Sequence, residues 1–504
     1  MTYILLIMMG VHVEQKNLFS YGVDLNKRVR SDNPLRKIAE VIDFSFVREE
    51  VHSLYGRNGN ESVDPEIILK MMFLLFLDNV KSERELMRII PERMDYLWFL
   101  GYTLDDEVPN HSVLSKARKR WGRDIFEQFF VLSVQQCVEA GLVGGEKIHV
   151  DGSVIAADAS QASVVNAGPE LIAELKRLYS VEEQKLESAR EYKYYQRKNK
   201  RMLSLTDPDA PVVRHSKQGS DGISRPRYKQ HRSVDDDHGV ITAQTTTPGD
   251  IEENVQLEPL IDQHETNTGH PLKTVVGDKQ YGTVENYRQL QKRGLNTHMD
   301  HGNPGNKKAL EAIYPLSDFI YQSDSDTYIC PAGQTLYRRR HDPIRKSTEY
   351  KARKGVCAQC PVKDQCTKAK AGRTVARHDQ QELVDKGRIQ AKSKAAKRDR
   401  GRRRFLGEGS FGQAATNHHF KRSRWRRLWR QKIQDDLIAS IQKIKILIKY
   451  AQPKPAQTRT GCVVVDRLIF RGLGRLREPV EAFLRSLRIF LVIDGRELKH
   501  SLGI

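Results

Sequence analysis

The chain has 504 residues, of which 38% are hydrophobic and 29% are charged, and its formal net charge is +20. This length predicts two to four domains, and the composition excludes a disordered chain. No apolar run approaches the roughly 20 residues of a membrane-spanning helix. Six cysteines exclude a disulfide-rich secreted protein. The start MTYILLIMMG has no basic region and no small-residue cleavage site, so we expect no signal peptide and a cytoplasmic protein. The positive charge indicates an anionic partner, nucleic acid or a membrane surface.

Residues 1–145 predict a helical N-terminal domain. Asp64 followed by Pro65 is typical of a helix start, and apolar residues then recur at helical spacing through Val80. A short helix over residues 112–121 carries four basic side chains, Lys116, Arg118, Lys119 and Arg120. We predict that this domain binds DNA through these residues. A helical bundle with a solvated basic face is the alternative.

An apolar strand over residues 148–150 ends on an acid, Asp151. After a polar helical stretch, Pro169–Arg201, the turn-rich residues 202–230 predict a loop. Two strands joined by a turn at Asp236–Gly239 follow, and then a helix at 252–263.

A second buried strand, Thr274–Val276, ends on Gly277–Asp278, and a helix from about Val284 to Lys292 follows it. Ligands and reactive groups gather at this edge of open α/β sheets. Two carboxylates on adjacent strands need a countercharge, and oxygen ligands select Mg²⁺ or Mn²⁺. The pattern therefore indicates a metal site built on Asp151 and Asp278.

Three segments, IHVDGSVIAA, YKQHRSVDDDHGVITAQTTTPGDIEEN and TVVGDKQYG, resemble in this order the DDE transposases of bacterial insertion sequences. The resemblance covers roughly residues 40–450 and includes HSVLSKARKR and the TDPDA at 206–210. It implies an α/β fold with an RNase H-like mixed-sheet catalytic core over residues 146–450. That core would hold a helical insertion at 161–227 and a four-cysteine insertion at 325–375.

The resemblance also implies the chemistry. Asp151, Asp278 and a glutamate on a late helix, Glu408, would hold two Mg²⁺ (or Mn²⁺) ions. One ion would activate water to cut at the end of the element, and the freed 3′-hydroxyl would then attack target DNA. Arg404 precedes Glu408 by four residues, shares its face on a helix, and is expected to contact phosphate. Gly401 and Ala415 stand where relatives often have tyrosine and lysine, so whether this copy is active stays open.

Each acid also has a simpler interpretation. A single aspartate at a strand end is usually a turn former, and a glutamate among arginines is usually a surface ion pair. Their order along the chain favours the catalytic interpretation. Asp158 is expected to be a loop residue, and Asp235–Asp237 to form a hairpin turn.

The cysteines form a second constellation. Cys330, Cys357, Cys360 and Cys366 follow the spacing C-x26-C-x2-C-x5-C, and the C-x2-C pair is typical of zinc sites. We predict structural Zn²⁺ there, with four reduced thiols as the alternative. Cys137 and Cys462 are expected to be packing residues.

Basic residues gather on both sides of Glu408. Residues 386–404 hold ten Lys or Arg and one acid, Asp399, and residues 421–432 hold seven and no acid. We predict salt-sensitive DNA binding here. The residues we assign to it are Lys421, Arg422, Arg424 and Trp425. Membrane-surface binding is the alternative, which the position beside Glu408 disfavours.

The expected partner is double-stranded DNA, both the terminal inverted repeats and the target. We expect a homo-oligomer, at least a dimer, that is associated with the nucleoid. A membrane partner is not expected. Two other functions stay open: a non-catalytic DNA-binding repressor derived from a transposase, and an RNase H-like nuclease without strand transfer. Residues 451–504 begin with the proline-rich AQPKPAQ and receive no predicted role.

Overall fold

The computed structural model describes residues 9–10, 23–56, 61–180, 201–214, 224–301 and 313–450. The chain forms two compact units, Met1–Ala451 and Gln452–Ile504. The C-terminal tail and Cys462 lie outside the described residues. None of the helices within these ranges is long and apolar enough to cross a membrane.

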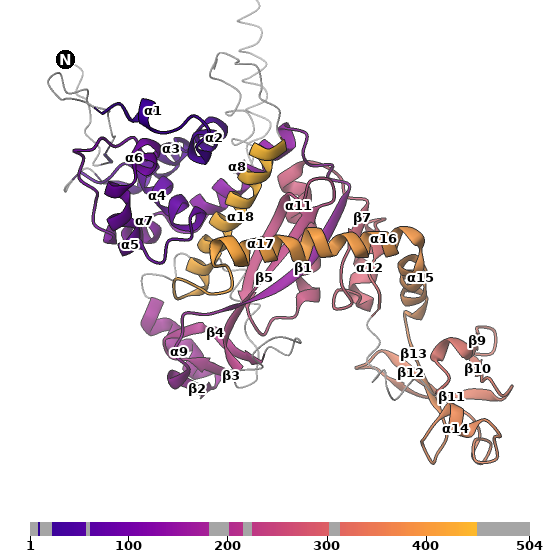
Figure 1. Cartoon of the computed structure of the whole chain (residues 1–504). Coiled ribbons are helices and arrows are strands. Elements are labelled where there is room, and N and C mark those ends of the chain that lie inside the picture. Colours follow the sequence, from indigo (N-terminus) through magenta and orange to yellow (C-terminus); the bar gives the residue numbers. More distant parts are fainter. Residues whose placement is uncertain are drawn as a thin grey trace, which may run out of the picture. The chain divides into compact units, whose positions relative to one another are not determined.

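The first part of the chain is helical, as predicted (Figure 1). Asp64 accepts a hydrogen bond from the Glu66 backbone N–H at 2.9 Å and Pro65 is the first helical residue, so the predicted start of α4 is confirmed. Arg48 pairs with Asp64 at 2.7 Å and ties α3 to that start. The helices are α1 (Leu25–Arg28), α2 (Pro34–Val41), α3 (Phe46–Val51), α4 (Pro65–Leu77), α5 (Glu83–Ile89), α6 (Met94–Leu100), α7 (Ser112–Trp121) and α8 (Asp124–Glu139), with 3-10 turns η1 (His52–Leu54) and η2 (Ile90–Glu92).

These helices do not form a core by themselves. Phe73 and Phe76 of α4 belong to an apolar cluster that also contains Phe411 of α17 (Gly409–His418) and Leu437 of α18 (Leu428–Tyr450). Each such side chain contributes about 1.5–3 kcal/mol on burial. Helices from opposite ends of unit 1 are therefore held in one core.

The central sheet is mixed. β1 (Lys147–Ala156) pairs antiparallel with β5 (Ser224–Asp235) and parallel with β7 (Thr274–Val276). The order β6-β5-β1-β7-β8 is that of an RNase H-like core, so the predicted fold class is confirmed. The remaining elements are β6 (Ile241–Pro248), η5 (Glu253–Gln256), α11 (Leu257–Thr268), α12 (Val284–Lys292) and β8 (Asn296–His298).

The segment between β1 and β5 differs from its prediction. The helix predicted for Pro169–Arg201 begins at Pro169 as expected, and its residues 181–200 lie outside the described residues. The turn-rich residues that predict a loop instead contribute to β3 and form β4. Val212 of β4 pairs with Pro226 of β5. β4 forms because the long β5 offers it a pairing partner, and turn residues in the local sequence do not indicate such a partner. The elements are η3 (Gln161–Ser163), β2 (Val164–Ala167), α9 (Pro169–Ser180), β3 (Arg201–Ser204) and β4 (Asp207–Arg214).

A second sheet has five strands in the order β13-β12-β11-β10-β9, all antiparallel. It has a small apolar core of its own, which includes Phe319, Tyr328 and Tyr350. This sheet carries the four-cysteine segment. Its elements are η6 (Leu316–Asp318), β9 (Ile320–Gln322), β10 (Thr327–Ile329), β11 (Thr335–Asp342), β12 (Ser347–Lys351), α14 (Lys363–Cys366) and β13 (Thr374–His378).

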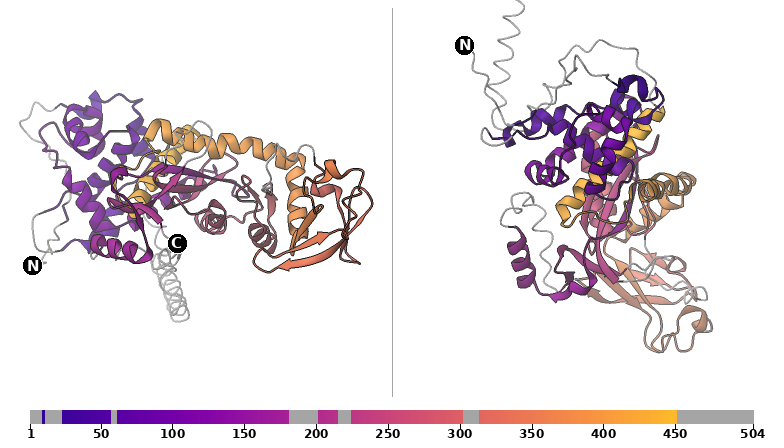
Figure 2. Two further views of the ribbon diagram at one scale, coloured as in Figure 1. Left: turned by 90° about the horizontal axis from the view of Figure 1, so that it is seen from below. Right: turned by 60° about the vertical axis from the view of Figure 1, so that its left-hand side comes forward.

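The last helices run from α15 (Gln381–Lys392) through α16 (Lys394–Arg403), the π-helical turn η7 (Arg404–Glu408) and α17 to α18. α18 packs against α8 and β6 (Figure 2). It buries two acids: Thr246 donates to Asp435 at 2.5 Å, and Gln244 donates to Asp436 at 2.6 Å. Burial raises the pKa of Asp435 to about 7 and that of Asp436 to about 6.

The buried Asp435 makes stability depend on pH. Because its pKa is higher in the folded than in the unfolded chain, its contribution to stability is full at low pH and is lost as the pH rises through about 7. Because Asp435 of the wild type loses its proton between pH 5 and pH 8, we expect Asp435→Asn to raise the free energy of unfolding by roughly 1–2 kcal/mol more at about pH 8 than at about pH 5. Urea denaturation at both pH values tests this, and an equal loss of stability at both would contradict it.

Candidate active site

Asp151 lies on β1, and Asp278 lies two residues beyond the end of the neighbouring parallel strand β7. β1 does not end at Asp151 but continues to Ala156, because β5 pairs along it to that residue. Val276 of β7 lies opposite His149, and continuing this register by two residues places Asp278 beside Asp151. Asp278 also accepts a hydrogen bond from the Gln280 backbone N–H at 2.8 Å, so it forms a turn as well.

The carboxyl group of Asp151 is buried among like charges. Burial raises its pKa to about 6; Arg403 opposes this rise, and the charges of Asp278 and Glu253 add to it. Glu253 was not singled out by its sequence. Its carboxyl carbon lies 2.8 Å from where a Cβ on Gly152 would be, so only glycine at that position leaves room for it.

Arg403 joins the first and the third predicted acids. Its guanidinium lies 3.1 Å from Asp151 and 3.0 Å from Glu408. The spacing of four residues predicts that Arg404 shares a face of an α-helix with Glu408, and its contact with phosphate stays a prediction. η7 is a π-helix, in which residues five apart come together, so Arg403 faces Glu408 and Arg404 is exposed.

Gly407 allows η7 to approach β1. A Cβ on Gly407 would lie 3.3 Å from the Cβ of Asp151, which is tighter than ordinary contact. The glycine next to Glu408 therefore has a packing role at the site.

Oxygen ligands of this kind suit Mg²⁺ or Mn²⁺, and the raised pKa of Asp151 marks a place where positive charge is needed. In this structure Arg403 supplies that charge. Within the described ranges, no three His, Cys, Asp or Glu side chains are arranged to hold a metal ion. The donor chemistry thus fits a divalent ion, and Arg403 would have to release Asp151 for one to bind there.

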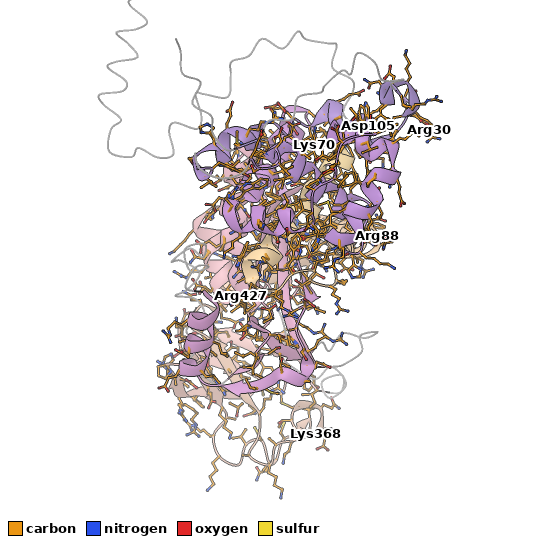
Figure 3. The ribbon with its side chains drawn as sticks, turned by 90° about the vertical axis from the view of Figure 1, so that its left-hand side faces the viewer. Arg30, Lys70, Arg88, Asp105, Lys368 and Arg427 are labelled. Atoms are coloured by element: carbon orange, nitrogen blue, oxygen red, sulfur yellow. The ribbon has the colours of Figure 1, made fainter. Side chains whose placement is uncertain are left out.

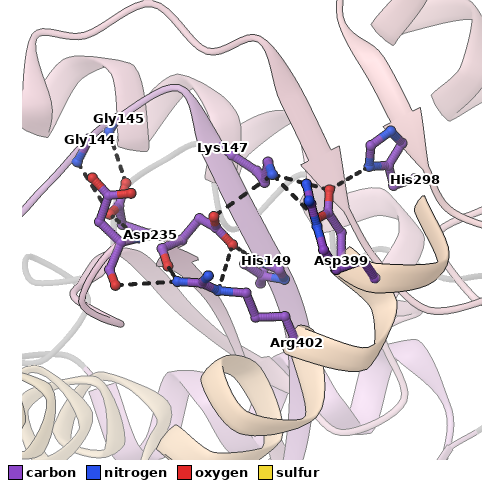
Figure 4. A network of polar contacts seen from close by, with 11 residues as sticks. Gly144, Gly145, Lys147, His149, Asp235, His298, Asp399 and Arg402 are labelled. Atoms are coloured by element: carbon purple, nitrogen blue, oxygen red, sulfur yellow. Dashed lines mark hydrogen bonds and ion pairs between the residues drawn. The ribbon is translucent and has the colours of Figure 1, made fainter. Parts of the chain in front are cut away.

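A polar network fixes α16 to β1 close to these acids (Figure 4). The buried Asp399 of α16 accepts hydrogen bonds from His298 at 2.8 Å and from Lys147 at 3.3 Å. Against the effect of burial, these bonds hold the pKa of Asp399 below its ordinary value. The single acid of the basic run is therefore a structural partner.

The second half of the network starts from Asp236. It lies 2.7 Å from His149, which precedes Asp151 by two residues on the same face of β1, and 3.1 Å from Arg402 of α16. Asp236 and Asp237 also form the turn after β5, as predicted, but the prediction was wrong for Asp235: it is the buried last residue of β5 and accepts hydrogen bonds from the Gly144 N–H at 3.3 Å and the Gly145 N–H at 2.9 Å. The network sets the position of α16, and through it that of Arg403 and Glu408.

A second group of basic residues lies beside β1. We call residues 419–427 the basic loop. Its Lys421 carbonyl accepts a hydrogen bond from the Ala156 backbone N–H at 2.9 Å, and the Ser423 N–H donates to the Ala156 carbonyl at 2.8 Å. The Lys421 ammonium donates to Ser153 at 2.6 Å, on the face of β1 that carries Asp151. Lys421 and Arg422 are exposed, which suits their predicted DNA contacts.

Three other residues expected to bind DNA pack against the protein: Arg118 is buried, which contradicts its expected DNA contact, whereas Arg424 and Trp425 are half-buried. Arg118 is 3% exposed, pairs with Glu83 and stacks at 3.9 Å over the ring of Trp425. Trp425 in turn packs edge-on against Phe76. Arg424 donates to Asn79 at 2.8 Å, and burial lowers its pKa to about 10. Sequence position alone could not distinguish these basic side chains from the solvated ones.

The remaining basic residues of α7 are at the surface. Lys116, Lys119 and Arg120 are exposed, and Arg120 also stacks over Tyr55 at 4.4 Å. Their DNA-binding role stays a prediction. Asp158 lies in a loop, as expected, and pairs with Arg426 at 3.5 Å.

The four predicted zinc ligands, Cys330, Cys357, Cys360 and Cys366, line one pocket of the five-stranded sheet. Burial raises the pKa of the Cys366 thiol, and the other three cysteines contribute to that rise. The four cysteines share this pocket, but among the described residues they are not arranged to hold a metal ion, so zinc stays a prediction. Cys137 is buried, as expected of a packing residue.

Comparison with known proteins gives two family matches. Residues 23–120 match the transposase domain DUF772, and residues 329–447 match a transposase DDE domain. A cryo-EM structure of a piggyBac transposase synaptic complex with hairpin DNA aligns at 10% identity and a TM-score of 0.24, covering 85% of this chain and 84% of that one. No curated protein matches the chain.

The contact between Gly407 and Asp151 predicts a local stability effect. We expect Gly407→Ala to lower the free energy of unfolding by about 1–2 kcal/mol, because the new methyl group would press on Asp151. Gly412→Ala on α17 is the matched control, since a Cβ there meets nothing within 4 Å, and it should stabilise by up to about 1 kcal/mol. Urea denaturation of both variants tests this, and equal effects would contradict the assigned contact.

Proposed function

We propose that this chain, which belongs to the transposases with a DUF772 domain and a DDE domain, cuts DNA at the ends of an insertion sequence and joins those ends to target DNA. Water would hydrolyse a phosphodiester bond to a 3′-hydroxyl and a 5′-phosphate. That 3′-hydroxyl would then attack the phosphorus of a target phosphodiester, forming a new P–O bond while the 3′-oxygen of the target strand leaves as a hydroxyl.

One observation carries the proposal. Asp151 is on β1, Asp278 lies two residues after the parallel neighbour β7, and Arg403 joins Asp151 to Glu408 of η7. Three acids separated by 127 and 130 residues are thereby gathered at one place on the sheet. Surface ion pairs would not require such burial of Asp151.

Asp151, Asp278 and Glu408 are the residues that would hold Mg²⁺ or Mn²⁺. A bound ion of this kind lowers the pKa of water and stabilises charge on the phosphoryl oxygens. The negative charges of Asp278 and Glu253 beside Asp151 favour binding of a cation. In this structure the Arg403 guanidinium pairs with both Asp151 and Glu408.

The basic loop is suited to hold the DNA. Lys421 and Arg422 are exposed beside the end of β1, so they can neutralise phosphates of a strand that reaches Asp151. Lys116, Lys119 and Arg120 of α7 offer a second basic surface.

The catalytic assignment is tested by Glu408→Gln and Asp151→Asn. Each removes a metal-binding charge, so each should lower Mg²⁺-dependent cleavage of a terminal-repeat duplex by about 1,000-fold or more. DNA binding in Ca²⁺ should remain. Asp262→Asn, which removes an exposed acid of α11, is the control and should cleave normally.

Cleavage by Glu408→Gln at the wild-type rate would refute the role of Glu408. Wild-type protein that binds the duplex but never nicks it in Mg²⁺ or Mn²⁺ would instead indicate a repressor. Cleavage without joined products in a strand-transfer assay would indicate a nuclease.

We further propose that the four-cysteine pocket binds structural zinc. Elemental analysis of purified protein should then find one zinc per chain. Cys357→Ser combined with Cys360→Ser should abolish it and destabilise the five-stranded sheet, because a small module with little core depends on its metal. Cys137→Ser, outside the pocket, should retain zinc. Metal-free wild-type protein with an intact sheet would contradict the proposal.

A further inference from the structure

Two buried aspartates of β4 are not used by the proposed chemistry. Asp207 is 0% exposed and Asp209 is 5% exposed. They are two residues apart on one strand and so point to the same face. Burial and the neighbouring Asp209 raise the pKa of Asp207, which indicates that holding two acids here is costly. A buried pair of like charges needs specific partners.

Those partners lie at the junction of the basic loop and α18. The Arg427 backbone N–H donates to Asp207 at 3.2 Å, and the Leu428 N–H donates to Asp209 at 3.1 Å. The Arg427 guanidinium also donates to Asp209 at 2.9 Å. Tyr228 of β5 donates to Asp207 at 2.7 Å and holds the acid in place. The aspartates therefore cap the N-terminus of α18, where negative charge is favourable.

Arg427 has an unusual backbone conformation. Its φ is 82°, in the left-handed region that residues other than glycine seldom occupy. Arg427 is also buried, at 5% exposure, in contrast to Arg30 and Arg88, whose side chains are largely exposed; all three are labelled in Figure 3. Such a backbone conformation is maintained only when surrounding contacts stabilise it. Here the hydrogen bonds of Arg427 with Asp207 and Asp209 provide those contacts.

The other end of the basic loop is fixed on β1. Lys421 and Ser423 bond to Ala156, and the Arg424 backbone N–H donates to Gln434 of α18 at 2.9 Å. With the aspartates at residues 427–428, the loop is held at both ends and in the middle. Lys421, Arg422 and Arg426 remain at the surface.

We propose that Asp207 and Asp209 are positioning residues: they clamp Arg427 so that the basic loop presents Lys421, Arg422 and Arg426 to the phosphates of a DNA strand beside Asp151. This inference rests on the DNA binding proposed above. It gives the TDPDA segment a role in holding substrate, without contact between its acids and DNA.

A double-mutant cycle tests the clamp by fluorescence anisotropy, with a labelled duplex of arbitrary sequence in EDTA over a range of salt concentrations. Lys421→Ala combined with Arg422→Ala should weaken binding about tenfold and reduce the salt slope by about 2. Asp209→Ala should reduce the slope similarly. In the Asp209→Ala background the two loop substitutions should have less than about a twofold further effect.

Asp209→Asn keeps an acceptor oxygen for the Leu428 N–H, so it should bind DNA more tightly than Asp209→Ala. If Asp209→Ala does not fold, Asp209→Asn replaces it in the double-mutant cycle. Asp64→Ala is the matched control, because Asp64 likewise caps a helix and pairs with an arginine. It should lower stability without changing the salt slope.

Additive effects of the loop and Asp209 substitutions, or unchanged binding by Asp209→Ala, would overturn the clamp alone. Wild-type protein that shows no salt-dependent DNA binding would overturn the proposed function as well.

Discussion

The ion pairs of Arg403 with Asp151 and Glu408 are the interaction on which the candidate site depends. Asp151 is buried next to Asp278 and Glu253, and a carboxylate in that setting needs positive charge nearby. Arg403 reaches it because the π-helical η7 lies close to β1, and η7 lies there because Gly407 has no side chain. The π-helical turn η7 thus brings the positive charge of Arg403 to the buried carboxylate of Asp151 on β1.

Buried polar contacts also hold the surrounding elements in place. Asp399 fixes α16 to β1 and β8, Asp435 fixes α18 to β6, and Asp209 fixes the start of α18 to β4. Each joins segments far apart in the sequence. Burying such groups gains little stability in itself, but losing one partner leaves the other unsatisfied, so the arrangement is specific. The elements that carry acids and basic residues are therefore constrained relative to one another.

Local signals predicted much of the fold. The Asp64–Pro65 helix start, the strand Thr274–Val276 and the helix Val284–Lys292 occur as expected, because capping and periodicity act within a few residues. Predictions about individual basic residues were less successful. Arg118 and Arg424 are packed against aromatic rings, since an aromatic face and a nearby acceptor can stabilise a buried guanidinium.

The sequence by itself determined the order of the strands and helices from β5 to α12, the places of the three acids along the chain, and the concentration of positive charge around Glu408. Only the tertiary structure decided that Arg403 rather than Arg404 faces the acids, that Glu253 lies beside them, and that β4 pairs with β5. The physical reason is range. Propensity and periodicity depend on the nearest residues in the sequence, whereas burial, strand pairing and the partner of a charge depend on which elements the fold brings together, such as Arg403 and Asp151.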